Sequence, residues 1–133
     1  MDRRPRGARA HVLVYHDDPV ILQLVRDILA PSYKVTLALN PSELEAQMAI
    51  VRPDLLVLGL PAANRAAPPR FPEMIRNIGG RAIPKVALTT EDNLPGTLGA
   101  AFDEVICEPF RISTLRDAVG RLAPIELMRP GSA

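Results

Sequence analysis

The chain has 133 residues, most simply one domain, and is long enough to bury roughly two-thirds of its unfolded surface. Apolar residues make up 47% of the sequence and charged residues 23%, as in an ordinary globular protein. The net charge of +1 gives no general attraction to nucleic acid or membranes. The lone Cys107 excludes an intramolecular disulfide, and no apolar run approaches the roughly 20 residues that span a bilayer. We therefore expect a cytoplasmic protein that does not bind membranes.

The two ends of the chain differ in composition from its middle. Residues 1–10 are rich in Arg, Pro, Gly and Ala and predict a disordered arm, and residues 124–133 predict a flexible tail. Without interleaved aromatic residues or a helix-turn-helix pattern, the arginines favour a solubilising arm over a nucleic-acid contact. Residues 11–123 are left as a single domain.

The first half of this domain alternates between strand and helix patterns. A short buried strand over residues 12–15 is followed by Asp18, which can cap a helix, and by Pro19 at its first position. An apolar stripe of helical period follows, which we expect to face the core: Val20, Ile21, Leu24, Val25, Ile28 and Leu29. A second strand is expected over residues 33–39.

The next helix begins with a capping pattern. Asn40 is a suitable cap, Pro41 follows it, and Glu43 stands where a capping box places its acid. We expect three residues of this helix to face the core: Leu44, Met48 and Val51.

The second half repeats the alternation with weaker helix signals. Strands are expected over residues 54–60, 83–88 and 105–107, with Cys107 as a small core residue. Residues 61–70 predict a long loop and 71–78 a short helix, whereas Pro and Gly predict a short or irregular helix over 92–101. The last helix, over residues 112–122, should turn four residues inward: Ile112, Leu115, Val119 and Leu122.

Five strands alternating with five helices predict a parallel sheet covered on both faces. Ligands of such sheets bind at the carboxyl ends of the strands. The residues that follow or end the predicted strands should therefore share one edge: His16, Asp17, Gly59, Thr89 and Glu108.

Four segments, in this order and spacing, resemble a bacterial response-regulator receiver domain of the CheY type. They are residues 12–19 (VLVYHDDP), 53–60 (PDLLVLGL), 84–89 (PKVALT) and 108–110 (EPF), and the resemblance extends from about Val12 to Leu122. It implies a flavodoxin-like (βα)5 fold, a doubly wound parallel sheet of strand order 2-1-3-4-5 in a three-layer sandwich.

The resemblance also implies an altered pocket. The family's pair of magnesium-binding acids matches His16 and Asp17, and its phosphoacceptor aspartate matches Gly59. The hydroxyl is kept as Thr89, but Glu108 replaces the lysine and Val105 the switch aromatic. Because phosphoryl transfer depends on positioning and charge neutralisation, we expect a pseudo-receiver with no catalytic residue, no cofactor and magnesium binding lost or weak. Asp18, which is better explained as a helix cap, and Asp54, which lies at the amino end of its strand and away from the pocket, are not good replacement acceptors.

The charge changes in the pocket suggest a rearrangement. His16 and Glu108 could form a hydrogen-bonded pair, or each could be solvated independently. A zinc or manganese site of His16, Asp17, Glu91 and Glu108 is a weaker alternative. The Thr89 hydroxyl could bind an anion, although a bond to nearby backbone is the simpler interpretation.

We therefore expect a non-enzymatic, stand-alone protein-interaction module of signal transduction that works without phosphorylation. Its predicted partner-binding face, through which a homodimer could also form, contains Leu98, Val105, Arg111, Arg116 and Arg121. One alternative is a receiver phosphorylated at a non-standard residue. Another is a small enzyme or a ligand- or metal-binding flavodoxin-like module. The His-Asp-Asp sequence after the first strand disfavours this alternative, because it is not the Ser/Thr/Gly-rich loop that binds the phosphate of a flavin or nucleotide.

Overall fold

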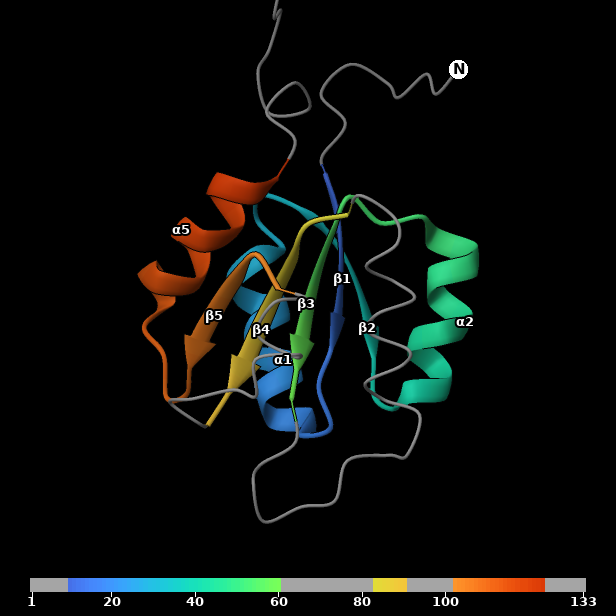
Figure 1. Cartoon of the computed structure of the whole chain (residues 1–133), viewed down its shortest axis with the longest axis horizontal. Coiled ribbons are helices and arrows are strands. Elements are labelled where there is room, and N and C mark those ends of the chain that lie inside the picture. The colour runs from blue at the N-terminus through green and yellow to red at the C-terminus, as the bar shows by residue number, and fades with distance from the viewer. Residues whose placement is uncertain (1–9, 61–82, 91–101, 124–133) are drawn as a thin grey trace, which may run out of the picture.

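A computed structural model describes residues 10–60, 83–90 and 102–123 of the chain. Their strands form one parallel sheet in the order β2-β1-β3-β4-β5, as predicted, and the arrows in Figure 1 all point the same way. The strands are β1 (His11–Tyr15), β2 (Lys34–Ala38), β3 (Leu55–Gly59), β4 (Lys85–Thr89) and β5 (Glu104–Cys107).

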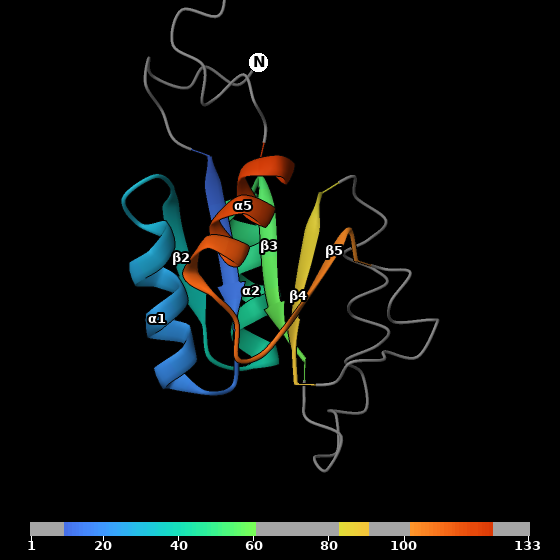
Figure 2. The same cartoon turned by 90° about the vertical axis from the view of Figure 1, so that its left-hand side faces the viewer.

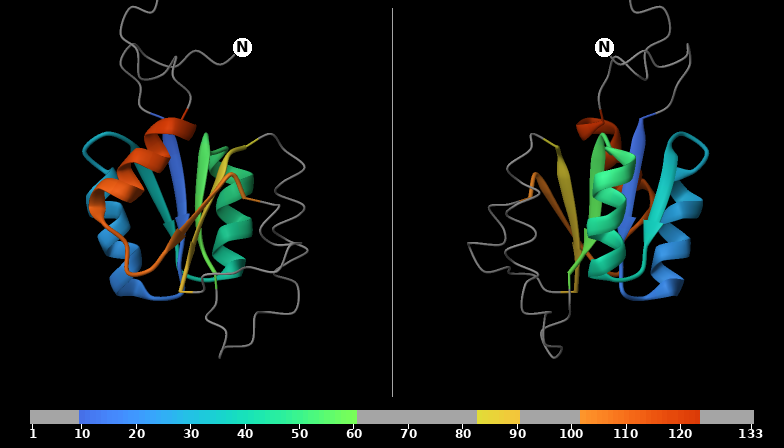
Figure 3. Two further views of the ribbon diagram at one scale, coloured as in Figure 1. Left: turned by 60° about the vertical axis from the view of Figure 1, so that its left-hand side comes forward. Right: turned by 90° about the vertical axis from the view of Figure 1, so that its right-hand side faces the viewer.

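The described helices cover both faces of the sheet. They are α1 (Pro19–Leu29), α2 (Pro41–Val51) and α5 (Ile112–Leu122). Helices α1 and α5 lie on one face and α2 on the other, which gives the predicted three layers (Figures 2 and 3). The expected loop at 61–70 and helices at 71–78 and 92–101 fall outside the described residues, as do 1–9 of the arm and the tail. Within the part of the chain that is described, no helix is long and apolar enough to cross a membrane.

The strands supply two apolar cores because successive side chains point to opposite faces. Residues of β3 and β4 are buried throughout, as expected for central parallel strands. The α1/α5 core contains Val12, Val14, Val57 and Leu88 from the sheet, with Val25, Leu29, Leu115 and Val119 from the helices. The α2 core contains Leu13, Tyr15, Leu56, Leu58 and Ala87, with Leu44 and Met48 from α2.

The helix starts follow the capping predictions. Asp18 Oδ1 accepts a hydrogen bond from the Val20 amide at 2.9 Å, and Asn40 Oδ1 accepts one from the Glu43 amide at 2.8 Å. Glu43 in turn accepts from the amide of Leu39, one residue before the cap, at 2.6 Å. Both turns that leave the sheet after β1 and β2 are therefore fixed by side chains.

The predicted inward faces of two helices are partly wrong. Val20 is 75% exposed and Ile112 51% exposed, and Leu24 is exposed as well. Leu22 and Ala118 are buried instead. Helix α1 is apolar around much of its circumference, so periodicity does not single out the face that the sheet covers. Residues Ile21, Val51 and Leu122, also predicted inward, are half-buried.

The prediction of a buried Cys107 is also wrong, because this cysteine is exposed. It lies on β5, which is one of the two edge strands of the described sheet. On β5 only Ile106 is buried, in the α1/α5 core, while its neighbours Val105 and Cys107 point to the opposite face and are exposed.

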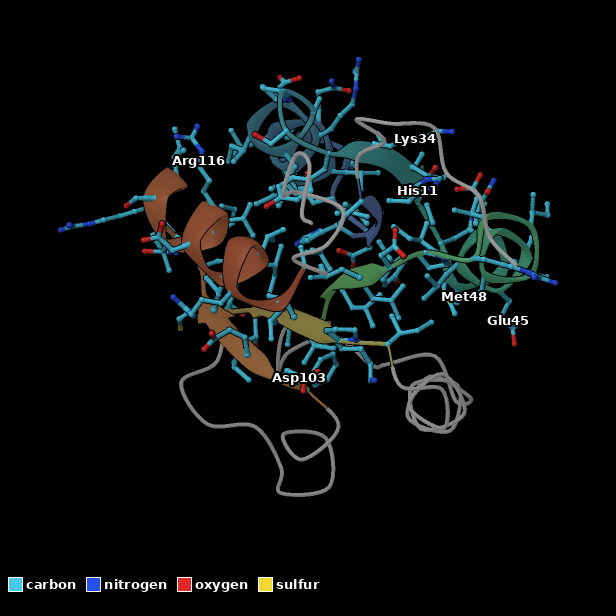
Figure 4. All side chains as sticks on the ribbon, turned by 90° about the horizontal axis from the view of Figure 1, so that it is seen from above. His11, Lys34, Glu45, Met48, Asp103 and Arg116 are labelled. Carbon is cyan, nitrogen blue, oxygen red and sulfur yellow. The ribbon has the colours of Figure 1, made fainter. Side chains whose placement is uncertain are left out.

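Two aspartates close the amino ends of the strands in the same way. Asp54 Oδ2 accepts from the amide of His11, and the Asp54 amide donates to the His11 carbonyl, both at 2.8 Å. Asp103 Oδ2 accepts from the amide of Lys85, and its own amide donates to the Lys85 carbonyl, again at 2.8 Å. Figure 4 looks onto this end of the sheet, with His11 and Asp103 labelled. Asp54 is thus a structural residue remote from the opposite edge, as predicted.

Candidate functional site

The carboxyl edge of the sheet, at the bottom of Figure 1, brings together residues from separate strands. His16 follows β1, Gly59 ends β3, Thr89 ends β4 and Glu108 follows β5. His16 is 6% exposed and Thr89 is fully buried, so these two polar residues of the edge lie within the protein.

The imidazole of His16 lies where a side chain of residue 59 would begin. A Cβ built on Gly59 would stand 2.7 Å from Cγ and 3.0 Å from Nε2 of the ring, and closer still to Cδ2. Carbon atoms in ordinary contact are about 3.5–4.0 Å apart. The ring in this position and a side chain at residue 59 therefore exclude each other.

Both ring nitrogens of His16 are hydrogen bonded. The backbone amide of Asp18 donates to Nδ1 at 3.0 Å, and Nε2 lies 3.0 Å from Glu108 Oε2. An amide N–H can only donate, so Nδ1 accepts and carries no proton. Nε2 then holds the hydrogen and donates it to the Glu108 carboxylate.

The pair predicted between His16 and Glu108 is thus present, and it is largely shielded from water. Their side chains are 8% and 10% exposed. A charge-assisted hydrogen bond is stronger than a neutral one, and removal of either partner would leave the other buried without its bond. The bond runs past the carboxyl ends of β3 and β4 and connects the segment after β1 with the segment after β5.

The other two predicted pocket residues lie beside this pair. Asp17 is more exposed, at 39% of its side chain, and its Oδ1 is 3.5 Å from the Nδ1 of His16. The Thr89 carbonyl accepts the Glu108 amide at 2.6 Å, which fixes the backbone from which the Glu108 side chain extends. Sequence reasoning missed the Asp18 amide, which orients the ring; a backbone donor leaves no signature in residue type.

The alternative metal site has no support among the residues that the structure describes. Within 10–60, 83–90 and 102–123 there is no group of three or more His, Cys, Asp or Glu residues that could hold a metal ion. Glu91, the fourth predicted ligand, lies outside these ranges.

The predicted partner-binding face is exposed where it is described. Val105 is 44% exposed, and Arg111, Arg116 and Arg121 are exposed too. Figure 4 shows Arg116 on the outer side of α5. Arg121 binds Glu104 of β5, and this hydrogen bond raises the pKa of the Arg121 guanidinium. Leu98 lies outside the described residues.

Comparison with solved structures identifies the fold. The Vibrio cholerae chemotaxis protein CheY4 is 24% identical with a TM-score of 0.72, and the match covers 86% of this chain and 99% of that one. A signal receiver domain from Pseudomonas fluorescens is 19% identical with a TM-score of 0.70, covering 86% and 94%. A CheY-like receiver domain from Methylobacillus flagellatus is 12% identical with a TM-score of 0.72, covering 86% and 99%. The chain has the CheY-like receiver fold.

The likeness to receivers rests on this structural match. The sequence matches no family model and no curated protein. The structural neighbours are response-regulator receivers, one of them in a receiver-modulated diguanylate cyclase from Pelobacter carbinolicus. The receiver fold places the His16–Glu108 pair at the carboxyl edge of the sheet, where ligands bind in open α/β folds.

Proposed function

We propose that this protein is a receiver-like interaction module of a signalling pathway that binds its partner without being phosphorylated. The observation that carries the proposal is the imidazole of His16 in the space next to Gly59. Resemblance to receivers assigns the phosphoacceptor to this position, but glycine offers no nucleophile and the ring leaves no room for one. A cytoplasmic location, a non-enzymatic role and the absence of a cofactor belong to the same proposal.

The charges at this edge support the proposal. Glu108 places a carboxylate where the receiver resemblance implies a lysine, and His16 replaces one of the two magnesium-binding acids. A phosphoryl group there would meet a like charge and would lack metal ligands. We infer that the site does not form an acyl phosphate and that magnesium binds weakly or not at all.

The first test is chemical. We expect no gain in intact mass after the full chain is incubated with acetyl phosphate and magnesium, because the acceptor position has no side chain. The same incubation without magnesium is the control. An added phosphoryl group would overturn the proposal, and peptide mapping would then locate it and test the alternative of a non-standard acceptor.

The second test concerns the partner-binding face, for which we propose Val105, Arg111, Arg116 and, outside the described residues, Leu98. Arg121 takes part only if its bond to Glu104 can open. A partner captured from the native host should bind equally well with and without acetyl phosphate treatment. Arg116→Glu on α5 should weaken binding at least tenfold, whereas Arg26→Glu, at an arginine that is also exposed but lies on α1, should not. Binding that requires the phosphodonor would contradict the proposal.

A homodimer through this face has no support in the structure or in the comparisons, and we do not propose one. The ligand- or metal-binding alternative is likewise favoured by no observation on the described residues.

A further inference from the structure

The hydrogen bond between His16 and Glu108 connects two segments that lie far apart in the sequence. His16 starts the connection from β1 to α1, and Glu108 starts the connection from β5 to α5. In the sheet order β2-β1-β3-β4-β5, two strands lie between them. The bond therefore links two segments at the carboxyl edge that the hydrogen bonds between neighbouring strands do not connect directly.

Each end of the link is anchored to backbone. At one end the Asp18 amide donates to Nδ1 of the ring, and Asp18 is also the cap of α1. At the other end the Glu108 amide donates to the Thr89 carbonyl at the end of β4. The start of α1 is thereby tied to the segment that leads into α5.

Residue 59 decides whether this link can form. The ring passes over the carboxyl end of β3, where only a residue without a Cβ leaves room for it. Even a single methyl group at residue 59 would displace the ring from its place opposite Glu108.

We propose that His16 and Glu108 form an internal clamp that holds the β5–α5 connection against the β1–α1 turn, and that Gly59 is the residue that permits it. The clamp fixes the approach to α5 in one conformation with no ligand bound. The clamp is compatible with the proposed function, but its test uses no phosphodonor. An experiment can therefore contradict the clamp without contradicting the proposed function, and the reverse.

The clamp is tested by amide hydrogen exchange and ring 15N NMR on the full chain. Gly59→Ala and Glu108→Ala should each speed exchange of the backbone amides of Asp18 and of residue 108 about tenfold or more, as expected when a buried hydrogen bond to a charged group is lost. Glu108→Gln keeps an acceptor and should retain most of the protection. Gly120→Ala is the matched control, because the one contact that a Cβ there makes among the described residues is with the Tyr33 hydroxyl at 4.0 Å, so the change should leave both amides unchanged.

The double variant gives the sharpest outcome. Gly59→Ala and Glu108→Ala remove the same bond, so the two amides should exchange little faster in the double variant than in either single variant.

The protonation of the His16 ring is a separate test. In the wild type, the 15N shifts of the ring should show a protonated Nε2 and an unprotonated Nδ1. Unchanged exchange in Glu108→Ala, full additivity of the two changes, or a protonated Nδ1 in a neutral ring would overturn the clamp. If Gly59→Ala does not fold, Glu108→Ala and the ring shifts still decide.

Discussion

The imidazole of His16 and a side chain at residue 59 would occupy the same volume. A side chain can therefore be introduced at residue 59 only if the ring of His16 is moved or replaced. The bond to Glu108 adds a third position, because the ring would otherwise bury an N–H with no acceptor. The three residues therefore act as one unit, and a single substitution toward the receiver pattern is expected to harm this unit before it restores anything.

Gly59→Asp alone should fail to create a phosphoacceptor and should lower the free energy of unfolding by about 1–3 kcal/mol, the usual cost of overpacking. The new carboxylate would meet both the ring of His16 and the charge of Glu108. The triple variant His16→Asp, Gly59→Asp, Glu108→Lys removes the ring and restores the charges that the receiver resemblance implies, with Thr89 already in place. We expect only the triple variant to gain a phosphoryl group from acetyl phosphate and magnesium in intact-mass analysis.

Comparing Gly59→Asp with the triple variant tests whether the ring of His16 excludes a side chain at residue 59. The triple variant without magnesium serves as control, and urea denaturation of each variant verifies folding. Phosphorylation of the single Gly59→Asp variant at the rate of the triple one would show that the ring moves aside freely. The exclusion between His16 and residue 59 would then be wrong.

How far the site could be predicted depends on the kind of contact. Topology places His16 and Glu108 at the same edge of a parallel sheet, and the receiver resemblance, in which an acid and a lysine are neighbours at these positions, suggests that the two residues pair. The occupation of the space beside Gly59 does not follow, since it depends on the direction that the ring takes after β1. The Asp18 amide that sets this direction is a backbone group, and residue types do not reveal it.

The amino ends of two strands, β1 and β4, are each bonded to an aspartate that precedes the neighbouring strand. Asp54 and Asp103 each accept a hydrogen bond from the first amide of an adjacent strand and return one from their own amide. A carboxylate that accepts a backbone amide makes a charge-assisted bond, which contributes more than a neutral one. The two residues thus set the register at which β1 and β4 begin.

Asp54→Ala should lower the free energy of unfolding by about 1–3 kcal/mol, because the His11 amide would lose its acceptor in a half-buried place. Asp103→Ala should cost less, since Asp103 is exposed and water can replace the carboxylate. Urea denaturation followed by circular dichroism measures both. Asp27→Ala on the exposed side of α1 is the control and should stay within about 0.5 kcal/mol of the wild type. Equal effects of all three changes would contradict this role.

The sequence predicts the positions of helices and strands better than it predicts which face of a helix is buried. Strong local signals, such as the Asp18 and Asn40 caps, fix where helices begin. The sequence does not predict the buried faces of α1 and α5 correctly, because Val20 and Ile112 are apolar yet lie where no described element covers them. Cys107 shows the same limit for a strand: an apolar triplet on an edge strand need not be buried on both faces.

The two cores of the molecule each enclose one tyrosine. Tyr15 ends β1 in the α2 core, and Tyr33 precedes β2 in the α1/α5 core. Both are 5% exposed. Burial raises the pKa of both phenols above 10.0, and for Tyr15 the charge of Asp17 adds to this effect. Alkaline pH should therefore lower the stability of both the α2 core and the α1/α5 core.

We expect the free energy of unfolding to fall as pH rises above 10, where an unperturbed tyrosine ionises. Below that pH both phenols are neutral in the folded and unfolded chain, so they add no pH dependence. Above it the unfolded chain releases its phenolic protons first, and stability is lost progressively as pH rises through the higher folded pKa values. Urea denaturation across this range, with tyrosinate absorbance of the folded protein, measures both effects. The variant Tyr15→Phe/Tyr33→Phe contains no tyrosine and should lose less stability over the same range, because only other groups still titrate. If the double variant and the wild type lose stability equally, the buried phenols do not govern the alkaline response of either core.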